Sequence, residues 1–245
     1  MTSLKTPAEL PDQAFRIRSF VRRSGRRTEA QERAHEALWP QFGLTVGAGL
    51  LDLEACFGRE AERFLEIGFG MGQSLLAIAK AAPDKDFIGV ETHRSGIGSL
   101  LLGVEQAALT NLRVYDADVV DVLAKCIPDA SLAGVQLFFP DPWQKRRHHA
   151  RRLIQADFIN TLATKLKPGG ELHLATDWED YAIYMMRIMA KADNFINLAG
   201  IHAYAARSPF RPILTKFEKR ALREGRQIWD MQFRRIPLYI ISPLT

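Results

Sequence analysis

Short runs of apolar residues alternate with longer stretches of helical periodicity through most of the chain, and the apolar runs end in glycine or polar residues. The runs predict five buried strands, at residues 63–67, 86–90, 112–115, 134–139 and 171–175. The stretches between and after them predict helices at residues 73–82, 95–108, 119–125, 152–166 and 178–191. Strands that alternate with helices of this length are typical of a parallel sheet covered on both faces.

The first part of the chain has a different pattern. Residues 28–39 predict a helix that begins at a capping box, in which Thr28 caps the first turn and Gln31 completes the box. Pro40 is expected to end this helix. The glycine-punctuated residues 43–49 are expected to form a loop.

The last part of the chain is also distinct. Residues 228–241 have extended character with no helix between them, which favours a closing antiparallel pair of strands. Residues 167–170, Lys-Pro-Gly-Gly, are expected to form a turn before the fifth strand. We therefore divide the chain into a basic N-terminal arm and helix, residues 1–60, and an α/β domain, residues 61–245.

Composition narrows the class of protein. Hydrophobic residues make up 47% of the chain and charged residues 25%, which is close to the average for globular proteins and excludes a largely disordered chain. No apolar stretch reaches the length of a membrane helix or of a signal-peptide core. The two cysteines, Cys56 and Cys126, lie far apart without metal-ligand spacing, so we expect neither a disulfide framework nor a cysteine zinc site. These features indicate a soluble cytoplasmic protein.

Positive charge gathers in three segments. The net charge is +5, and seven arginines lie within residues 16–33, five basic residues within 145–152 and seven within 207–226. Three such segments could form one face for the phosphates of a nucleic acid. The alternative for each segment is a solvated surface stretch.

A glycine-rich turn follows the first strand, in the sequence LEIGFGMGQS. Gly68, Gly70 and Gly72 allow the backbone to turn sharply and to approach a ligand at the carboxyl end of the strand, although a tight turn without a ligand has the same pattern. Glu66 places an acid beside this pocket. That charge would repel a pyrophosphate and attract an amino group, so S-adenosylmethionine fits better than a dinucleotide.

Acids also end the second and third strands. Glu91 follows the glycine turn by about 20 residues, the position from which a carboxylate can bind two ribose hydroxyls, and its alternative is an ordinary strand-end acid. Asp116 and Asp118 end the third strand. We choose Asp118 as the residue that reaches an adenine amino group, and a salt bridge or a helix cap is the alternative for either.

The fourth strand leads into the most unusual segment, FFPDPWQKRRHHARR. Asp141 stands between two prolines, which hold its carboxylate rigidly beside the ligand pocket. Trp143 offers a flat surface for a base, and a dense cationic run follows directly. A proline-rich loop with a solvated basic tail is the alternative. His148 and His149 are neighbours without a third ligand, which favours phosphate contact or exposure over metal binding.

Two later segments carry further candidates. Asp177 follows the fifth strand and could bind the exocyclic amine and ring N–H of a guanine, cap the next helix, or do both. Residues 208–213 form a proline-broken loop of the kind that often folds over a site. In the following segment TKFEKR, Glu218 could bind guanine or pair with Arg220 or Arg223.

Six segments in order carry a resemblance that spans about residues 15–237. The chain resembles the bacterial tRNA (guanine-N7)-methyltransferase family in RSFVRRSGRRTEAQ, LEIGFGMGQSL, FIGVE, FFPDPWQKRRHHARRL, LATDWEDYA and TKFEKR. The Asp-Pro-Trp sequence with its basic run is much more specific than the glycine turn. Gln144 departs from the family, which more often has proline or histidine there, and this leaves the path of the loop open.

The resemblance implies a Rossmann-like, seven-stranded methyltransferase sheet, mostly parallel with a final antiparallel strand. It implies that residues 1–60 are an RNA-contacting extension and that residues 61–245 are the catalytic domain. The expected reaction moves a methyl group from S-adenosylmethionine to N7 of a guanine, position 46 in the variable loop of tRNA. The expected partner is tRNA, with no metal or membrane, and the protein is a monomer or a homodimer.

The resemblance also assigns roles by position, with Asp141 as the catalytic acid. The residues expected to contact the donor are Glu66, Gly68, Gly70, Gly72, Glu91, Asp118 and Asp141. Those expected to contact the substrate are Lys145, Asp177, Thr215, Lys216, Phe217 and Glu218. Those expected to contact RNA are Arg147, His148, His149, Arg151 and Arg152. The alternatives are a methyltransferase for another RNA, an amine or a protein, a non-catalytic RNA-binding protein and, more faintly, a dinucleotide oxidoreductase.

Overall fold

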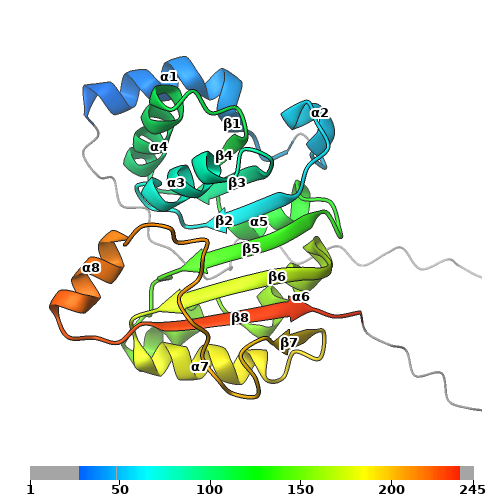
Figure 1. Cartoon of the computed structure of the whole chain (residues 1–245), viewed down its shortest axis with the longest axis vertical. Coiled ribbons are helices and arrows are strands. Elements are labelled where there is room, and N and C mark those ends of the chain that lie inside the picture. Colours follow the sequence, from blue (N-terminus) through cyan, green and yellow to red (C-terminus); the bar gives the residue numbers. More distant parts are fainter. Residues whose placement is uncertain (1–27, 48, 238–245) are drawn as a thin grey trace, which may run out of the picture.

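One sheet organises the molecule. The computed structural model describes residues 28–47 and 49–237, so the arginines of the predicted arm before Thr28 lie outside the described residues. The described strands follow the order β1-β4-β3-β2-β5-β6-β8-β7 across the sheet (Figure 1). They are β1 (Gly43–Leu44), β2 (Arg63–Ile67), β3 (Asp86–Glu91), β4 (Leu112–Asp116), β5 (Leu132–Phe138), β6 (Leu166–Thr176), β7 (Phe195–Asn197) and β8 (Trp229–Arg235). β8 is antiparallel to β6 and β7, and the other neighbours are parallel.

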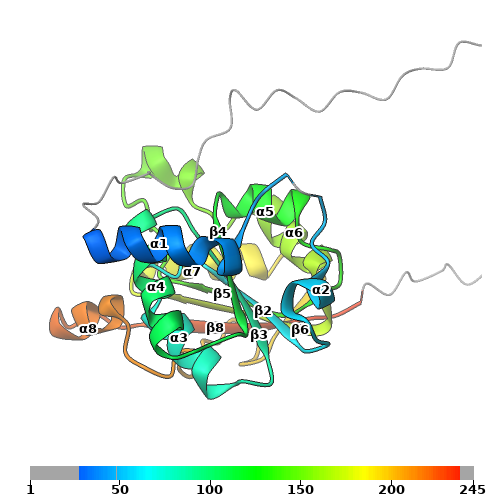
Figure 2. The same ribbon diagram turned by 90° about the horizontal axis from the view of Figure 1, so that it is seen from above.

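Helices cover both faces of the sheet, which is why the central strands are almost continuously apolar. The main helices are α1 (Glu29–Phe42), α3 (Gln73–Ala81), α4 (Arg94–Gln106), α5 (Val119–Lys125), α6 (Ala156–Lys165) and α7 (Glu179–Met189). Phe64 of β2 packs in a core cluster with α1, α3 and α4, whereas Leu65 packs in a second cluster with α5, α6 and α7. Figure 2 shows α3 on one side of the strands and α5 and α6 on the other.

The expected fold class is confirmed, with one strand more than predicted. The additional strand, β1, comes from a segment expected to be a loop, and it pairs Gly43 with Val114 and Leu44 with Tyr115 of β4. A two-residue strand is too short to leave a periodic pattern. Without it, the sheet has the seven strands that the resemblance implied.

The antiparallel end of the sheet is built differently from the prediction. β8 pairs with β6 on one side and with β7 on the other, so its partners lie earlier in the chain and not within residues 228–241. Residues 238–241 lie outside the described part of the chain. The expected turn at 167–170 is contained within β6, where the register with β5 is irregular.

Two predicted helix boundaries were wrong. α1 continues through Pro40 to Phe42, whose ring is buried in the core and holds the last turn in place. The helix predicted over residues 152–166 begins only at Ala156, and the basic run before it forms a separate 3₁₀ helix, η2 (Arg146–Arg151). Two short helices had no predicted counterpart: α2 (Leu53–Phe57) and α8 (Lys216–Arg223).

The start of α4 packs directly against the glycine turn that follows β2. A Cβ atom at Gly96 would lie 1.9 Å from the carbonyl oxygen of Gly70, so only glycine permits this approach. In the same helix, a Cβ at Gly103 would meet mainly the Cδ2 atom of Leu76, at 2.5 Å. The first contact is with rigid backbone, whereas the second is with the end of a flexible side chain.

Gly96→Ala is therefore expected to lower the free energy of unfolding by about 1–3 kcal/mol through overpacking. Gly103→Ala is the matched control, because Leu76 can rotate and alanine gains about 1 kcal/mol of helix propensity over glycine. Urea unfolding of the two variants measures the difference. Equal effects of the two substitutions would contradict the close packing of α4 on the turn.

Candidate active site

A pocket opens at the carboxyl ends of the parallel strands. It holds about 850 Å³ of empty space, including the solvent at its mouth. Its wall comes from the ends of β2, β3 and β5, from the start of α5 and from α8. The predicted site residues that line it are Gly68, Gly70, Glu91, Asp118, Asp141 and Phe217.

The glycine turn at the base of the pocket has a backbone that other residues would strain. φ is +70° at Gly68, +58° at Gly70 and +75° at Gly72. These values lie in the left-handed region, which glycine adopts without a Cβ clash. The backbone N–H of Gly70 donates to Oε2 of Glu91 at 2.8 Å, so the turn and the end of β3 are fixed to each other.

Hydrogen bonds from the backbone hold the side chain of Glu91 in one orientation. Besides the bond from the glycine turn, its Oε1 atom accepts hydrogen bonds from the backbone N–H groups of Thr92 at 2.7 Å and His93 at 3.0 Å. Its side chain also lines the pocket. The carboxylate thus organises its own strand end and lines the pocket, and its contact with ribose hydroxyls stays a prediction.

The two acids after β4 have separate roles. Asp118 lines the pocket, and its Oδ1 atom accepts a hydrogen bond from the backbone N–H of Val120 at 3.0 Å, which caps α5. Asp116 forms an ion pair with Arg94, with 3.0 Å between Oδ2 and Nε. The choice of Asp118 as the residue nearer the ligand space agrees with this arrangement.

Glu66 immediately precedes the pocket-lining residues Ile67 and Gly68 and is only 4% exposed. Among the described residues its Oε2 atom has no hydrogen-bond partner. Burial, reinforced by the negative charge of Glu91 and opposed by the positive charge of Arg211, raises the pKa of Glu66 to about 8. A buried carboxyl of this kind would gain strongly from a cationic group placed beside it.

Asp141 stands in a strained loop at the end of β5. The residues on either side of the Pro-Asp-Pro sequence both have left-handed backbones, with φ of +54° at Phe139 and +45° at Trp143. Non-glycine residues adopt this region rarely, and such strain is concentrated at functional sites. The prolines restrict the backbone between these two points, and the Asp141 side chain is exposed.

The prediction that Arg152 contacts RNA was wrong. Arg152 is only 2% exposed, because its guanidinium turns inward and lies over the rings of Tyr181 and Tyr184. Its Nε donates to the carbonyl oxygen of Pro142 at 2.9 Å, and its Nη2 lies 2.5 Å from Oδ2 of Asp180. The last arginine of the basic run therefore supports the Asp141 loop.

The rest of the basic run is at the surface on η2. Arg151 lies over the Trp143 ring, with 5.0 Å to the ring centroid, and His148 meets the same ring edge-on. Desolvation and the charges of Arg151, Arg147 and Lys145 lower the pKa of His148. No group of side chains within residues 28–47 and 49–237 has the make-up of a metal site.

Asp177 has a partner that the sequence did not reveal. Its Oδ2 atom lies 2.6 Å from Nη2 of Arg226, and both side chains are largely buried. α7 begins at Glu179 without a side-chain cap, so the alternative in which Asp177 caps this helix was wrong. The ion pair instead connects the end of β6 to the segment that leads into β8.

α8 brings one aromatic residue to the pocket. Thr215 and Glu218 form a capping box at its start, with 3.1 Å from the Glu218 N–H to Thr215 Oγ1 and 2.8 Å from the Thr215 N–H to Glu218 Oε2. Phe217 is half exposed, lines the pocket and stacks on Phe139 with 5.8 Å between ring centroids. Lys145 and Lys216 are exposed and do not contribute to the pocket wall.

Glu218 pairs with neither of the arginines proposed from the sequence. It is fully buried, and its Oε1 atom lies 2.8 Å from Nε of Arg207 and 3.1 Å from Nε of Arg211. These contacts lower its pKa despite burial. Glu218 therefore organises the start of α8. Neither arginine stood out in the sequence, because both belong to a basic segment whose charges suggested phosphate contact or a solvated surface.

The comparisons with known proteins agree with this geometry. A family model described as "Putative methyltransferase" matches residues 60–231. The tRNA (guanine-N(7)-)-methyltransferase of Alcanivorax borkumensis is 53% identical over 90% of this chain and 92% of its own, and that of Pseudoalteromonas atlantica is 51% identical over 96% and 100%. The chain belongs to the tRNA (guanine-N(7)-)-methyltransferase family.

Solved structures of other methyltransferases share the fold. The 16S rRNA methyltransferase KamB has a TM-score of 0.56 at 13% identity and covers 77% of this chain and 95% of its own. A 16S rRNA (adenine(1408)-N(1))-methyltransferase from Catenulisporales acidiphilia has a TM-score of 0.52 at 14% identity and covers 80% and 97%. At these identities the likeness concerns the fold alone.

In the described part of this family member, no helix has both the length and the apolar character to cross a bilayer.

The raised pKa of Glu66 predicts a specific pH dependence of stability. In the folded protein Glu66 keeps its proton up to a pH of about 8, whereas an unfolded chain releases it near the ordinary value of 4.5. Its contribution to stability is therefore fully present below pH 4.5 and is lost as the pH rises through about 8.

Glutamine does not ionise, so the Glu66→Gln variant lacks this pH-dependent loss of stability. Its Tm relative to wild type is therefore expected to increase between pH 5 and about 8 and then to level off. Thermal denaturation of both proteins in matched buffers measures the difference. A difference in Tm that stays constant across this range would show that Glu66 ionises normally.

Proposed function

We propose that this chain transfers the methyl group of S-adenosylmethionine to N7 of the guanine at position 46, in the variable loop of tRNA. The observation that carries the proposal is the position of Asp141, an exposed carboxylate on a loop with a restricted backbone, in the wall of a pocket that the glycine turn also lines. The family of the chain supports the same reaction and acceptor.

The residues around the pocket fit the methyl donor. Glu66 is a buried carboxyl with an unpartnered oxygen in the described structure, and it suits the ammonium group of the methionine part. The pre-oriented carboxylate of Glu91 suits the ribose hydroxyls, and Asp118 suits the adenine amino group. The turn at Gly68 and Gly70 leaves room for close approach, since added Cβ atoms there would meet open space. When bound, S-adenosylmethionine supplies a methyl group on a positively charged sulfur.

The reaction needs alignment and electrostatic stabilisation more than proton transfer. Guanine N7 carries a lone pair and no proton, so its electrons form the new N–C bond while the C–S bond breaks, and no general base is required. The guanine becomes positively charged. Asp141 stabilises that charge as it develops, and its rigid loop keeps the carboxylate in place throughout. The pocket wall aligns N7 with the methyl group.

The acceptor side is formed by α8, Asp177 and the basic run. Phe217 and Phe139 form a stacked aromatic wall against which the guanine can lie. Arg226 holds Asp177 through Oδ2, and we assign the other oxygen to the amine edge of the guanine. Lys145, Thr215 and Lys216 bind the adjoining nucleotide. The tRNA backbone lies along η2, where Arg147, Arg151, His148 and His149 contact phosphates.

Purified protein with labelled S-adenosylmethionine and an unmodified tRNA transcript is expected to label one guanine, located by cleavage at N7-methylguanine in the variable loop.

Asp141→Asn keeps the shape of the loop and removes the charge, so kcat is expected to fall by about 10²–10³-fold with little change in tRNA affinity. Asp84, which lies away from the pocket, provides the matched control Asp84→Asn. Equal losses of kcat and of affinity would contradict the catalytic role of Asp141, and label in another base would contradict the assigned acceptor.

The two arginines that end the basic run are expected to behave differently. Arg151→Gln should reduce the slope of log Kd for tRNA against log salt by about 1, because one phosphate contact is lost. Arg152→Gln should instead lower the free energy of unfolding by about 1–3 kcal/mol, because it leaves the Pro142 carbonyl without its charged donor. Binding titrations at several salt concentrations and urea unfolding separate the two effects. If Arg152→Gln reduced the salt slope and Arg151→Gln did not, Arg152 and not Arg151 would be the residue that contacts phosphate.

A further inference from the structure

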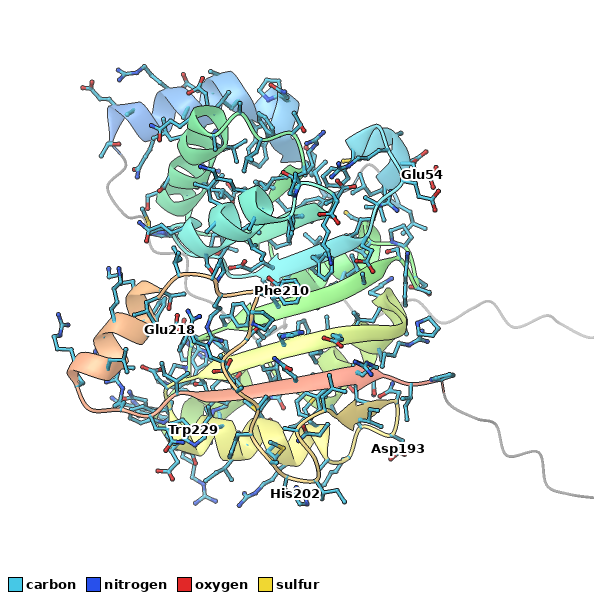
Figure 3. All side chains as sticks on the ribbon, in the orientation of Figure 1. Glu54, Asp193, His202, Phe210, Glu218 and Trp229 are labelled. Carbon is cyan, nitrogen blue, oxygen red and sulfur yellow. The ribbon has the colours of Figure 1, made fainter. Side chains whose placement is uncertain are left out.

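A segment between β7 and α8, residues 198–215, crosses the outer face of the sheet, and we call it the strap. Figures 1 and 3 show it running over β8 and β6 towards α8, with Phe210 above the strands. Ser208 fixes it through a backbone N–H bond to Asp230 at 3.2 Å and a side-chain bond to His173 at 2.9 Å. Phe210 packs on Phe64 and His173, with ring centroids 5.1 Å and 5.0 Å apart.

Arg211 is the central residue of the strap. It is fully buried, and each nitrogen of its guanidinium has a carboxylate partner. Nη1 and Nη2 donate to the two oxygens of Asp230 on β8 at 2.7 and 2.8 Å, and Nε donates to Glu218 on α8 at 3.1 Å. Figure 3 shows Glu218 at the start of α8, where this helix meets the strap. One planar cation thus joins α8 to the sheet.

The same guanidinium also contacts the end of β5. It lies over the rings of Phe138 and Phe139, 4.9 and 5.5 Å from their centroids. Phe139 is the strained residue that begins the Asp141 loop, and Phe217 of α8 stacks on its ring. Arg211 therefore contacts both sides of the aromatic wall. It contacts the Phe139 ring directly, and it binds Glu218 at the start of the helix that carries Phe217.

We propose that Arg211 is a positioning residue for methyl transfer, because it locks α8 and the Asp141 loop into one register and so sets the aromatic wall against which the acceptor base lies. This inference rests on the proposed function, since it assigns the wall to the acceptor. Lysine keeps the charge of Arg211, but it has a single nitrogen and cannot bridge Asp230 and Glu218 in the same plane.

A purely structural role for Arg211 would predict loss of stability alone. A second buried arginine provides the comparison, since Arg63 is only 6% exposed and lies near Asp86 at the opposite edge of the sheet, with 3.8 Å between Nε and Oδ2. Arg63→Lys should lower stability without changing turnover per folded molecule. Arg211→Lys should lower turnover as well, because a small misplacement of reacting groups costs about 10²-fold in rate.

The experiment measures four quantities for wild type, Arg211→Lys and Arg63→Lys: urea stability, Kd for S-adenosylmethionine by calorimetry, kcat and KM for tRNA, and amide hydrogen exchange in residues 214–223. We expect Arg211→Lys to lower kcat by about 10²-fold, to keep donor affinity within a few fold, and to accelerate exchange in α8. Arg63→Lys should leave kcat and α8 exchange unchanged. Normal kcat and exchange in folded Arg211→Lys would overturn the inference.

Two further variants keep the test informative. If Arg211→Lys fails to fold, Asp230→Asn replaces it, since the amide oxygen still accepts one bond and the Glu218 contact remains. Phe217→Ala tests the pathway: its effect on kcat should be much smaller in the Arg211→Lys background than in the Arg63→Lys background, because the wall is already displaced. Additive effects in both backgrounds would count against positioning. A wild type that labels no tRNA would refute the proposed function instead, whatever the exchange data show.

Discussion

The architecture depends on one constraint: parallel strands place their carboxyl ends at the same edge of the sheet. β2, β3, β4 and β5 each finish there, and each delivers one acid, directly or one turn later. Glu66, Glu91, Asp118 and Asp141 are far apart in the sequence and become neighbours only through strand pairing. Glu66 avoids mutual repulsion by keeping its proton up to a pH of about 8, and backbone N–H groups donate to the carboxylates of Glu91 and Asp118.

Phe217 reaches the pocket wall from the other end of the chain. The strap brings α8 back over the sheet, and ion pairs among the buried residues Arg211, Glu218 and Asp230, joined by the more exposed Arg207, hold it there. The buried ion pairs gain little net stability over apolar packing, because each buried charge loses its hydration. These ion pairs instead constrain geometry. Because the guanidinium of Arg211 is planar and binds carboxylates on both α8 and β8, it restricts how these two elements are placed relative to each other.

Much of this could be predicted from the sequence, and the failures have a common cause. The long parallel strands, the glycine turn and the acids after them follow from local periodicity, which depends on nearby residues. The sequence did not reveal the partners of Arg152, Asp177 and Glu218, because a charged residue in a basic run has the same pattern whether it is solvated or buried in an ion pair. β1 and α8 are too short, or too dependent on tertiary contacts, to leave a clear signal.

The inward orientation of Arg152 connects two segments that are neighbours in the sequence, the basic helix η2 and the Asp141 loop. η2 carries the residues proposed to contact phosphates, and Arg152, which follows it, donates to the carbonyl oxygen of Pro142, next to Asp141. In the proposed complex, binding of the RNA backbone to η2 would therefore act on the Asp141 loop through this hydrogen bond and through the short chain segment between Pro142 and η2. A short RNA fragment containing the target guanine but few flanking phosphates would then be a slow substrate even at saturation, since remote binding energy helps to order the catalytic loop.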